Sequence, residues 1–241
     1  MIDIHSHILP GIDDGASSLE MALEMLRMAV DDGVRMQCLT PHIHMGRYDN
    51  SAASLRASFE VFQQAVIEAN INIDLYLACE VRIAAEVMPL AKMDELLWLG
   101  RYQEKKVMLL EMPHNLIPVG CSNMIQWLLK QGIQPLLVHP ERNRELQTAP
   151  KKLDALLQSG CLTQITASSL TGHFGAVAQQ LSENLLLQDK VFAMATDCHN
   201  LDYRPPDLSE GLHAAEQLMG TQKARQLVFD NPASLFEGRV A

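Results

Sequence analysis

The sequence alternates along its whole length between two kinds of segment, short runs rich in apolar and β-branched residues and longer stretches with helical periodicity. The predicted strands cover Ile2–Ile4, Val34–Thr40, Ile73–Cys79, Lys106–Leu110, Gln134–Val138, Leu162–Thr166 and Val191–Thr196. The predicted helices cover about Ser18–Asp32, Ala52–Asn70, Cys121–Gln131, Lys151–Ser159, Gly175–Leu187, Ser209–Met219 and Gln222–Phe229. Seven such alternations with largely apolar strands predict an α/β fold, in which helices cover a parallel sheet.

The first predicted helix carries signals at both ends. Ser17-Ser18-Leu19-Glu20 fits a capping box, and Gly33 stands where a helix C-terminus favours glycine. No linker, low-complexity segment or internal repeat interrupts the alternation. We therefore expect a single domain over residues 1–241.

Histidines and acidic residues follow the C-terminal ends of six of the seven predicted strands. These residue types, 9 histidines and 29 acids among 241 positions, fill only about one position in six, so chance does not account for the pattern. The residues are His5, His7, His42, Glu80, Glu111, His139, Asp197 and His199. In a barrel of parallel strands every C-terminal end opens on one face, where active sites are built. The pattern therefore favours a closed TIM-like barrel over an open sheet.

These side chains suit metal binding. Imidazoles and carboxylates without a cysteine cluster favour Zn, Mn, Fe or Ni over a structural zinc site. Eight groups exceed the needs of one ion and predict a centre of two or three metals, with Asp14 as a ninth ligand. A single histidine or glutamate at a strand end is more often a solvated or core residue. Burying the whole set at one end of the barrel would cost folding free energy without cations, because buried charges need partners.

Composition excludes several classes of function. The net charge of −10 argues against a nucleic-acid partner, since such proteins neutralise phosphates with Lys and Arg. No apolar run reaches the ~18–20 residues that span a bilayer, and the N-terminus does not resemble a signal peptide. Five scattered cysteines indicate reduced thiols. We expect a cytoplasmic protein without membrane insertion, and no pattern predicts its oligomeric state.

The ordered motifs resemble the polymerase and histidinol phosphatase (PHP) superfamily. They are Met-Ile-Asp-Ile-His-Ser-His at the start, Asp13-Asp14-Gly15, Thr40-Pro41-His42, Glu80, Glu111, His139-Pro140-Glu141-Arg142 and Thr196-Asp197-Cys198-His199-Asn200. More narrowly, the chain resembles the bacterial metal-dependent protein-tyrosine phosphatases of capsule and exopolysaccharide operons, from residue 1 to about Pro232. The resemblance implies a distorted TIM-like (β/α)7 barrel, the PHP fold, with three metals. These are usually Mn²⁺, with Fe, Zn, Co and Mg as alternatives.

The same resemblance distributes the ligands and the substrate contacts. It implies that one metal binds His5, His7, Glu80 and Asp197. Glu80 would bridge to a second metal on Glu111 and His139, while Asp14, His42 and His199 would hold the third. Arg142 and Arg204 stand in the motifs that contact the substrate phosphate. A hydroxide between the metals would attack phosphorus, because cations lower the pKa of bound water.

The expected function is a metal-dependent protein-tyrosine phosphatase. The resemblance implies as substrate the phosphotyrosine tail of a membrane-bound autokinase that controls polysaccharide synthesis. Three alternatives share some of the features: a small-molecule phosphatase of the histidinol phosphatase type, an amidohydrolase, and a metal-binding scaffold without turnover. Amidohydrolases typically carry a bridging lysine at the fourth strand, where this sequence has Glu111. His44, His114 and Arg47 have no role that the sequence assigns.

One further pattern competes with the metal hypothesis. Cys198 and Arg204 have the C-x5-R spacing of cysteine-dependent tyrosine phosphatases. That mechanism needs a loop whose backbone N–H groups surround the phosphate ahead of a helix. The five intervening residues contain no glycine, so we interpret the spacing as a coincidence.

Overall fold

The computed structural model describes residues 1–236. The strands are β1 Ile2–Asp3, β2 Met36–Leu39, β3 His42–Ile43, β4 Asp74–Leu77, β5 Glu80–Arg82, β6 Arg101–Tyr102, β7 Lys105–Glu111, β8 Ile133–Val138, β9 Leu162–Thr166 and β10 Ala193–Ala195. The helices are α1 Leu19–Asp31, α2 Ala52–Glu68, α3 Val87–Lys92, α4 Cys121–Lys130, α5 Arg144–Thr148, α6 Lys152–Gln158, α7 Ala167–Leu170, α8 Ala176–Leu187, α9 Ser209–Met219, α10 Thr221–Gln226 and α11 Asp230–Ser234. A 3₁₀ turn covers Pro140–Arg142.

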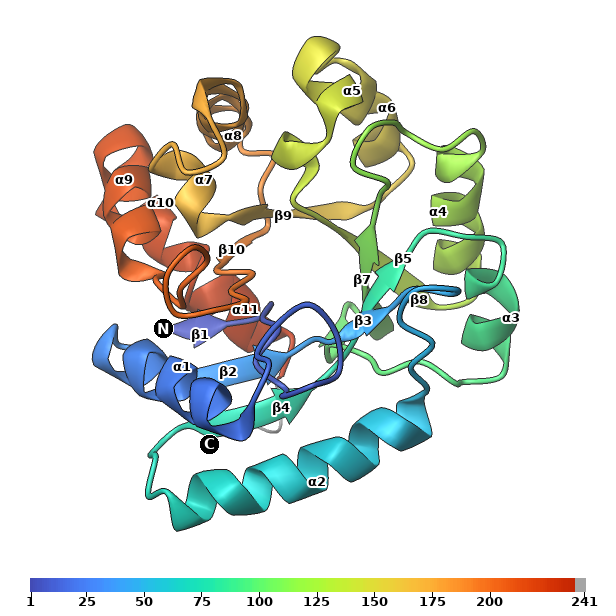
Figure 1. The fold of residues 1–241 in the computed structure, drawn as a ribbon. Coiled ribbons are helices and arrows are strands. Elements are labelled where there is room, and N and C mark those ends of the chain that lie inside the picture. The colour runs from blue at the N-terminus through green and yellow to red at the C-terminus, as the bar shows by residue number, and fades with distance from the viewer. Residues whose placement is uncertain (237–241) are drawn as a thin grey trace.

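The strands pair in two sheets that are almost wholly parallel. One sheet has the order β1-β2-β4, and the other has the order β10-β9-β8-β7-β5-β3, with β6 antiparallel to β7. Helices surround the strands in Figure 1. The predicted α/β fold with a mostly parallel sheet is therefore confirmed.

The two sheets meet at two places in the chain. The segments that follow β1 and β10 form a parallel bridge between Ser6 and Cys198, where the His7 N–H donates to the Cys198 carbonyl at 2.9 Å. At the other meeting point, β2 runs into β3 and β4 into β5. The Glu80 N–H lies there 3.3 Å from the carbonyl of Thr40. Strand ends from both sheets are therefore brought to the same region.

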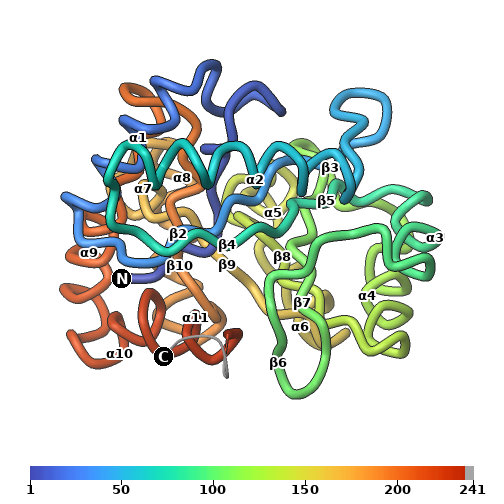
Figure 2. The backbone as a smooth tube through the Cα atoms, turned by 90° about the horizontal axis from the view of Figure 1, so that it is seen from below, coloured from blue at the N-terminus to red at the C-terminus, as the bar shows by residue number. Residues whose placement is uncertain are grey.

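Alternation along the strands separates two apolar clusters and places the polar site. In β7, Met108 and Leu110 pack with residues of the helices, whereas Val107 and Leu109 pack in a second cluster with residues of other strands. Because side chains two apart share a face, Glu111 continues the side of Val107 and Leu109. The carboxyl ends of the strands lie toward the upper side of Figure 2, opposite α10, α11 and β6.

The capping box predicted at the start of α1 is not present. Ser18, and not Ser17, is the N-cap: its hydroxyl accepts a hydrogen bond from the Met21 N–H at 3.2 Å. Glu20 therefore stands one position too early to complete a capping box. Gly33 ends the helix with φ +95°, as predicted.

Within residues 1–236, no helix combines the length and the apolar character that crossing a bilayer requires.

Candidate metal centre

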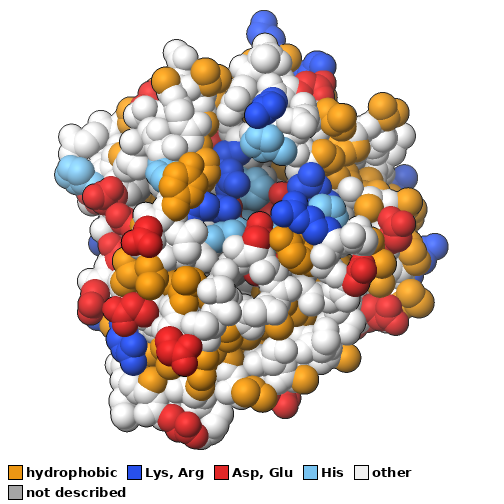
Figure 3. Space-filling view, in the orientation of Figure 1, with side chains coloured by type: hydrophobic (Ala, Val, Ile, Leu, Met, Phe, Trp, Pro, Cys, Tyr) orange, Lys and Arg blue, Asp and Glu red, His pale blue; other side chains and the backbone are white. Residues whose placement is uncertain are grey.

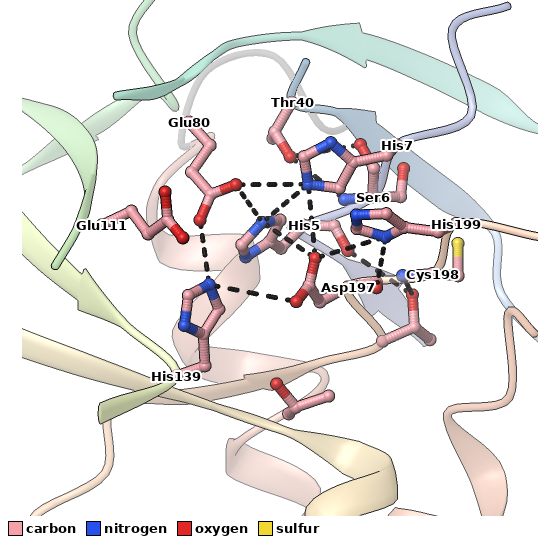
Figure 4. A network of polar contacts seen from close by, with 12 residues as sticks. His5, Ser6, His7, Thr40, Glu80, Glu111, His139, Asp197, Cys198 and His199 are labelled. Carbon is pink, nitrogen blue, oxygen red and sulfur yellow. Dashed lines mark hydrogen bonds and ion pairs between the residues drawn. The ribbon is translucent and has the colours of Figure 1, made fainter. Parts of the chain in front are cut away.

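All nine predicted ligands lie together at the carboxyl ends of the strands. They come from distant parts of the sequence because each parallel strand delivers its end to the same face. His42 and Glu80 begin β3 and β5, shortly after the ends of β2 and β4, whereas Glu111 ends β7 and His139 directly follows β8. The remaining five are His5 and His7 after β1, Asp14 before α1, and Asp197 and His199 after β10. Figure 4 shows seven of these side chains converging.

Glu80 is the centre of the cluster. Its side chain is 1% exposed, and four histidines surround its carboxylate. Oε2 lies 3.4 Å from His5 Nε2, 3.2 Å from His7 Nε2 and 3.0 Å from His42 Nδ1. Oε1 lies 2.9 Å from His139 Nε2. Both oxygens of Glu80 therefore face imidazoles that could hold a cation together with it.

Asp197 links the histidines to the two predicted phosphate residues. Oδ1 lies 3.4 Å from His5 Nε2 and 3.3 Å from His7 Nε2, while Oδ2 accepts hydrogen bonds from Arg142 Nη1 and Arg204 Nη2. Burial alone would raise the pKa of Asp197. Arg204, His5 and Arg142 outweigh burial, so this pKa lies well below its ordinary value.

The backbone is strained at two of the predicted ligands. His139 has φ +35° and Asp197 has φ +50°, which non-glycine residues seldom adopt. Such conformations persist only where the surroundings enforce them, and they gather at functional sites. Here they turn the chain at the ends of β8 and β10, so that both side chains face the cluster.

The residues present fit several metal ions. Four groups of side chains could each hold a metal ion, because inside each group the ligand atoms lie within 4.8 Å of one another. The groups are His7/Asp14/His42/His199, His5/His7/Glu80, His5/His139/Asp197 and His42/Glu80/Glu111. Five buried polar atoms here lack a hydrogen-bond partner within the described residues: His42 Nδ1, Glu80 Oε2, Glu111 Oε2, Asp197 Oδ1 and Arg204 Nε. Except for the arginine nitrogen, these are atoms that can coordinate a cation. The donor set therefore fits a multi-metal centre.

The ligand sets that the resemblance implies agree only in part with these groups. Asp14, His42 and His199, expected at one metal, lie together with His7. Glu111 and His139, expected at one metal with Glu80, fall in different groups, and Glu111 is paired instead with Arg82 at 2.8 Å. Arg82 was not singled out from the sequence.

Two supporting residues were also missed by sequence reasoning. Asp13 Oδ2 lies 2.7 Å from His7 Nδ1, and Gln164 Oε1 lies 2.8 Å from His5 Nδ1. A ring nitrogen held in this way fixes the orientation of a ligating histidine. Asp13 could have been suspected beside Asp14, whereas a glutamine inside β9 gives no signal in the sequence.

Gly15 allows the loop that carries Asp13 and Asp14 to pack against His7. A Cβ atom at position 15 would lie 1.9 Å from the His7 carbonyl oxygen, closer than any side chain tolerates. The Ala16 N–H donates to that same oxygen at 2.9 Å. The loop is thereby fastened beside the cluster.

Asp3 belongs to none of the four groups of possible metal ligands, although it lies two residues from His5. It is fully buried and accepts hydrogen bonds from Thr196 Oγ1 at 2.5 Å and from Gln37 Nε2 at 2.8 Å. Asp3 therefore links β1 to β2 and to the end of β10 through buried hydrogen bonds.

A small cavity opens directly onto the cluster, and most of the predicted ligands line it. Its volume is about 100 Å³, and its lining includes Arg142, Arg204, Arg47 and His44. In Figure 3, histidine and basic side chains meet in a hollow at the centre of this face, and the basic residues that line the cavity are arginines. His114 lines a separate hollow with Glu111 and Arg142. A larger cavity of about 650 Å³ shares no lining residue with the metal-type cluster.

Tyr48 covers one side of the cavity. Its ring stacks on that of His42, with the centroids 5.4 Å apart and the planes at 4°. The Arg47 guanidinium carbon lies 5.0 Å from the centre of the Tyr48 ring. These contacts hold His42 and leave Arg47 at the rim of the cavity.

The cysteines are placed as small buried residues. All five are free and buried. Cys198 is 0% exposed, and burial raises the pKa of its thiol above the ordinary value. A reactive cysteine needs an accessible thiolate, and Cys198 has neither property. The C-x5-R spacing is thus unsupported by the geometry.

The fold and this cluster define an α/β protein with a candidate multinuclear metal centre at the ends of its parallel strands. A comparison with family models makes the assignment specific. Residues 1–237 match the model for capsular polysaccharide synthesis, CpsB/CapC, and the chain belongs to this family. The resemblance to the capsule-operon phosphatases is thereby confirmed.

Individual relatives agree with the family. The tyrosine-protein phosphatase YwqE of Bacillus subtilis is 34% identical over 222 residues, which cover 92% of this chain and 86% of the relative. A structure from work on Bacillus subtilis YwqE and Streptococcus pneumoniae CpsB, described as metal-dependent tyrosine phosphatases, matches with a TM-score of 0.92 and 32% identity. It covers 100% of this chain and 96% of that one. The inactive dihydroorotase-like domain of a Chaetomium thermophilum protein shares the fold alone, with a TM-score of 0.61 at 12% identity and coverage of 98% and 78%.

Proposed function

We propose that this protein is a metal-dependent phosphomonoesterase that hydrolyses phosphotyrosine in a protein substrate. The observation that carries the proposal is the convergence of Arg142 and Arg204 on Asp197, at the edge of the metal-type cluster. Two guanidinium groups beside a group of carboxylates and imidazoles can hold a phosphate next to cations. The activities of the YwqE and CpsB relatives support the same reaction.

The metals are proposed to be three, with Mn²⁺ as the ion. The nine residues His5, His7, Asp14, His42, Glu80, Glu111, His139, Asp197 and His199 would hold them. Divalent cations supply a nucleophile at neutral pH and neutralise charge on the phosphate. Imidazole and carboxylate ligands suit Mn²⁺, Fe, Zn and Co, and magnesium is accepted by the carboxylates.

The protein's own groups bind and orient the phosphate. Arg204 Nη2 donates to the Asp197 carbonyl at 2.8 Å, which fixes the guanidinium, while its buried Nε has no partner within the described residues. A planar guanidinium donates two parallel hydrogen bonds to phosphate, and such donors stabilise the charge that develops during transfer. Tyrosine is a fairly good leaving group (pKa about 10), so a strong general acid is not required.

The size of the cavity favours a protein substrate over a small molecule. Its volume of about 100 Å³ is well below the ~300–1,000 Å³ of pockets that enclose a whole small ligand. Its lining also includes Glu80, Asp197 and His199, which would hold the ions, so this space cannot enclose a whole small substrate as well. A histidinol phosphatase would be expected to enclose its substrate more fully.

The biological setting is proposed from the family. The substrate would be the phosphotyrosine tail of a membrane-bound autokinase that controls capsular polysaccharide synthesis, reached from the cytoplasm. Free cysteines are compatible with that compartment. We also propose that the two sheets are parts of one distorted (β/α)7 barrel within a single domain, supported by the Ser6–Cys198 bridge.

The experiment that tests this function starts from chelator-stripped protein. Hydrolysis is measured with a phosphotyrosine peptide, a phosphoserine peptide of the same sequence and histidinol phosphate, before and after Mn²⁺ is added. We expect activity only with metal and preference for the phosphotyrosine peptide. Faster hydrolysis of histidinol phosphate would favour the small-molecule alternative. A folded, metal-loaded protein without activity on any substrate would favour a scaffold.

Three variants assign the residues in the same assay. Glu80→Ala should abolish turnover and weaken metal binding. Arg142→Ala should lower kcat/KM by about 10²- to 10³-fold, the usual cost of removing a preorganised donor, with the metal content unchanged. Arg144→Ala is the matched control, because Arg144 is an exposed arginine only two residues further along the chain. Equal losses in Arg142→Ala and Arg144→Ala would remove Arg142 from the phosphate site.

A further inference from the structure

The loop between α7 and α8, residues 171–175, lies beside the proposed metal centre and contributes none of its predicted ligands. It follows β9 and α7, and β9 is the one of the seven predicted strands whose end offered no histidine or carboxylate. β9 lies between β8 and β10, which lead to Arg142 and Arg204 respectively. The loop carries Phe174 into this region.

The Phe174 ring lies against Arg142 and near Arg204, the two proposed phosphate residues. The guanidinium carbon of Arg142 lies 4.4 Å from the ring centroid, and that of Arg204 lies 5.9 Å from it. A guanidinium over an aromatic face is held by attraction to the ring quadrupole. One aromatic ring therefore lies directly beside the groups that would bind the phosphate.

Backbone hydrogen bonds hold this ring in place. The His173 N–H donates to Ser168 at 3.0 Å, and the Gly175 N–H donates to Gly172 at 2.9 Å. Gln179 Nε2 donates to the Leu170 carbonyl at 3.0 Å and ties the end of α7, where the loop begins, to α8. The position of Phe174 is thus set by the fold rather than by the substrate.

The ring is not needed by the core. Phe174 is only half-buried and belongs to neither apolar cluster. Its aromatic neighbours are exposed as well: the His173 ring lies 5.0 Å from Phe174 and 4.5 Å from Tyr203, which is 64% exposed. Figure 3 shows a hydrophobic patch bordering the arginine atoms at the hollow. An apolar ring kept in contact with water beside a polar cavity is suited to contact a ligand.

We propose that Phe174 determines the preference for aryl phosphates: the phenyl ring of phosphotyrosine lies against Phe174 while its phosphate is held by Arg142 and Arg204. Arg142 and Arg204 line the cavity of about 100 Å³, and the Phe174 ring lies against these two residues rather than in the cavity itself. Aromatic pairs gain energy beyond their buried area. A serine or threonine phosphate has no ring to place there. This inference rests on the proposed phosphatase function.

The test compares binding of an aryl and an alkyl phosphate analogue. The Kd values of phenylphosphonate and methylphosphonate are measured by calorimetry on the Mn²⁺-loaded protein, together with kcat/KM for matched phosphotyrosine and phosphoserine peptides. Phe174→Ala should raise the Kd of phenylphosphonate roughly three- to tenfold and change that of methylphosphonate less than twofold. The preference for the phosphotyrosine peptide should fall by a similar factor.

Further variants separate selection of the aryl group from support of the arginines. Phe174→Trp should restore aryl binding, while Phe174→Leu should not, because leucine covers the guanidinium without offering a ring face. Val177→Ala, which shortens a 55% exposed apolar side chain at the start of α8, should change neither Kd. Equal weakening of both phosphonates by Phe174→Ala would mean that the ring acts only through the arginines, and would overturn the proposal. Unchanged binding of both would overturn it too.

A failure of the proposed function gives a different result. In that case the unsubstituted, metal-loaded protein would bind neither phosphonate and would hydrolyse no phosphotyrosine peptide. Failure of the Phe174 inference alone leaves a working phosphatase whose aryl preference survives Phe174→Ala.

Discussion

Oδ2 of Asp13 lies 2.7 Å from Nδ1 of His7, so a buried carboxylate orients an imidazole whose other nitrogen faces Glu80 and Asp197. The same oxygen accepts the His42 N–H at 2.9 Å. Burial would raise the pKa of Asp13, but His7 outweighs it and lowers that pKa to about 2. Asp13 is therefore a positioning residue for two of the proposed ligands.

Asp13→Asn should weaken Mn²⁺ binding by about 10- to 100-fold, the usual effect of removing a carboxylate behind a ligating histidine. The amide can no longer accept with both oxygens, so His7 loses its fixed orientation. Metal content and Kd are measured by mass spectrometry and calorimetry. Asp31→Asn, at an exposed acid of α1, is the control. Unchanged Mn²⁺ affinity in a folded Asp13→Asn variant would contradict this role.

Metal removal should destabilise the protein. Ions that bind only the folded state stabilise it by about 2.7 kcal/mol for each site at 100 times Kd, which for a chain of this size corresponds to roughly 5–10 °C in Tm. The measurement is thermal unfolding after chelation and after Mn²⁺ is added back. Asp31→Asn should show the same shift as the unsubstituted protein, and Glu80→Ala a much smaller one. A Tm indifferent to Mn²⁺ in protein shown to be metal-free would count against the centre.

Much of the fold was accessible from periodicity. The strand Leu162–Thr166 and the helix Ser209–Met219 were predicted with the observed bounds. The short strands β3 and β5 were missed, because two or three residues carry no periodic signal. Helix α3 was missed as well, since Pro89 lies inside it and proline argues against a helix interior.

The sequence predicted those site residues that directly follow recognisable strands. Parallel strands carry their final residues to one face, so the positions of His139 and Asp197 followed from their place after predicted strands. Residues that act through a second residue gave no such signal: Gln164 lies within a strand, and Arg82 follows Glu80 in β5. Phe174 was invisible for a similar reason, because its role depends on two arginines distant in the sequence.

Cysteine chemistry should be dispensable. Cys198 is fully buried and its thiol pKa is raised by burial, so iodoacetamide should leave activity intact. Cys198→Ala should keep kcat/KM within about threefold, with a modest drop in Tm from the small cavity. Cys121→Ala, a buried cysteine of α4, is the matched control for stability. Complete loss of activity in a folded, metal-loaded Cys198→Ala variant would revive the cysteine mechanism.

Glu141 should couple the turn of Arg142 to the element that precedes Phe174. Its Oε1 accepts hydrogen bonds from the Thr166 N–H at 2.9 Å and from Ser169 Oγ at 2.7 Å, and the residue is fully buried. The carboxylate thus fastens the 3₁₀ turn Pro140–Arg142 to the start of α7. Glu141→Ala leaves these buried donors without their acceptor, which costs roughly 1–3 kcal/mol of unfolding free energy.

The measurement is chemical unfolding of Glu141→Ala, Glu141→Gln and the exposed control Glu24→Ala, whose pair with Arg27 on α1 is worth only ~0.2–0.5 kcal/mol. Glu141→Gln keeps an oxygen acceptor, so it should recover part of the lost stability. Because Arg142 and the loop after α7 are both loosened, Glu141→Ala should also lower kcat/KM more than Glu141→Gln does. Equal stability of Glu141→Ala and Glu24→Ala would show that this buried carboxylate does not hold the two elements together.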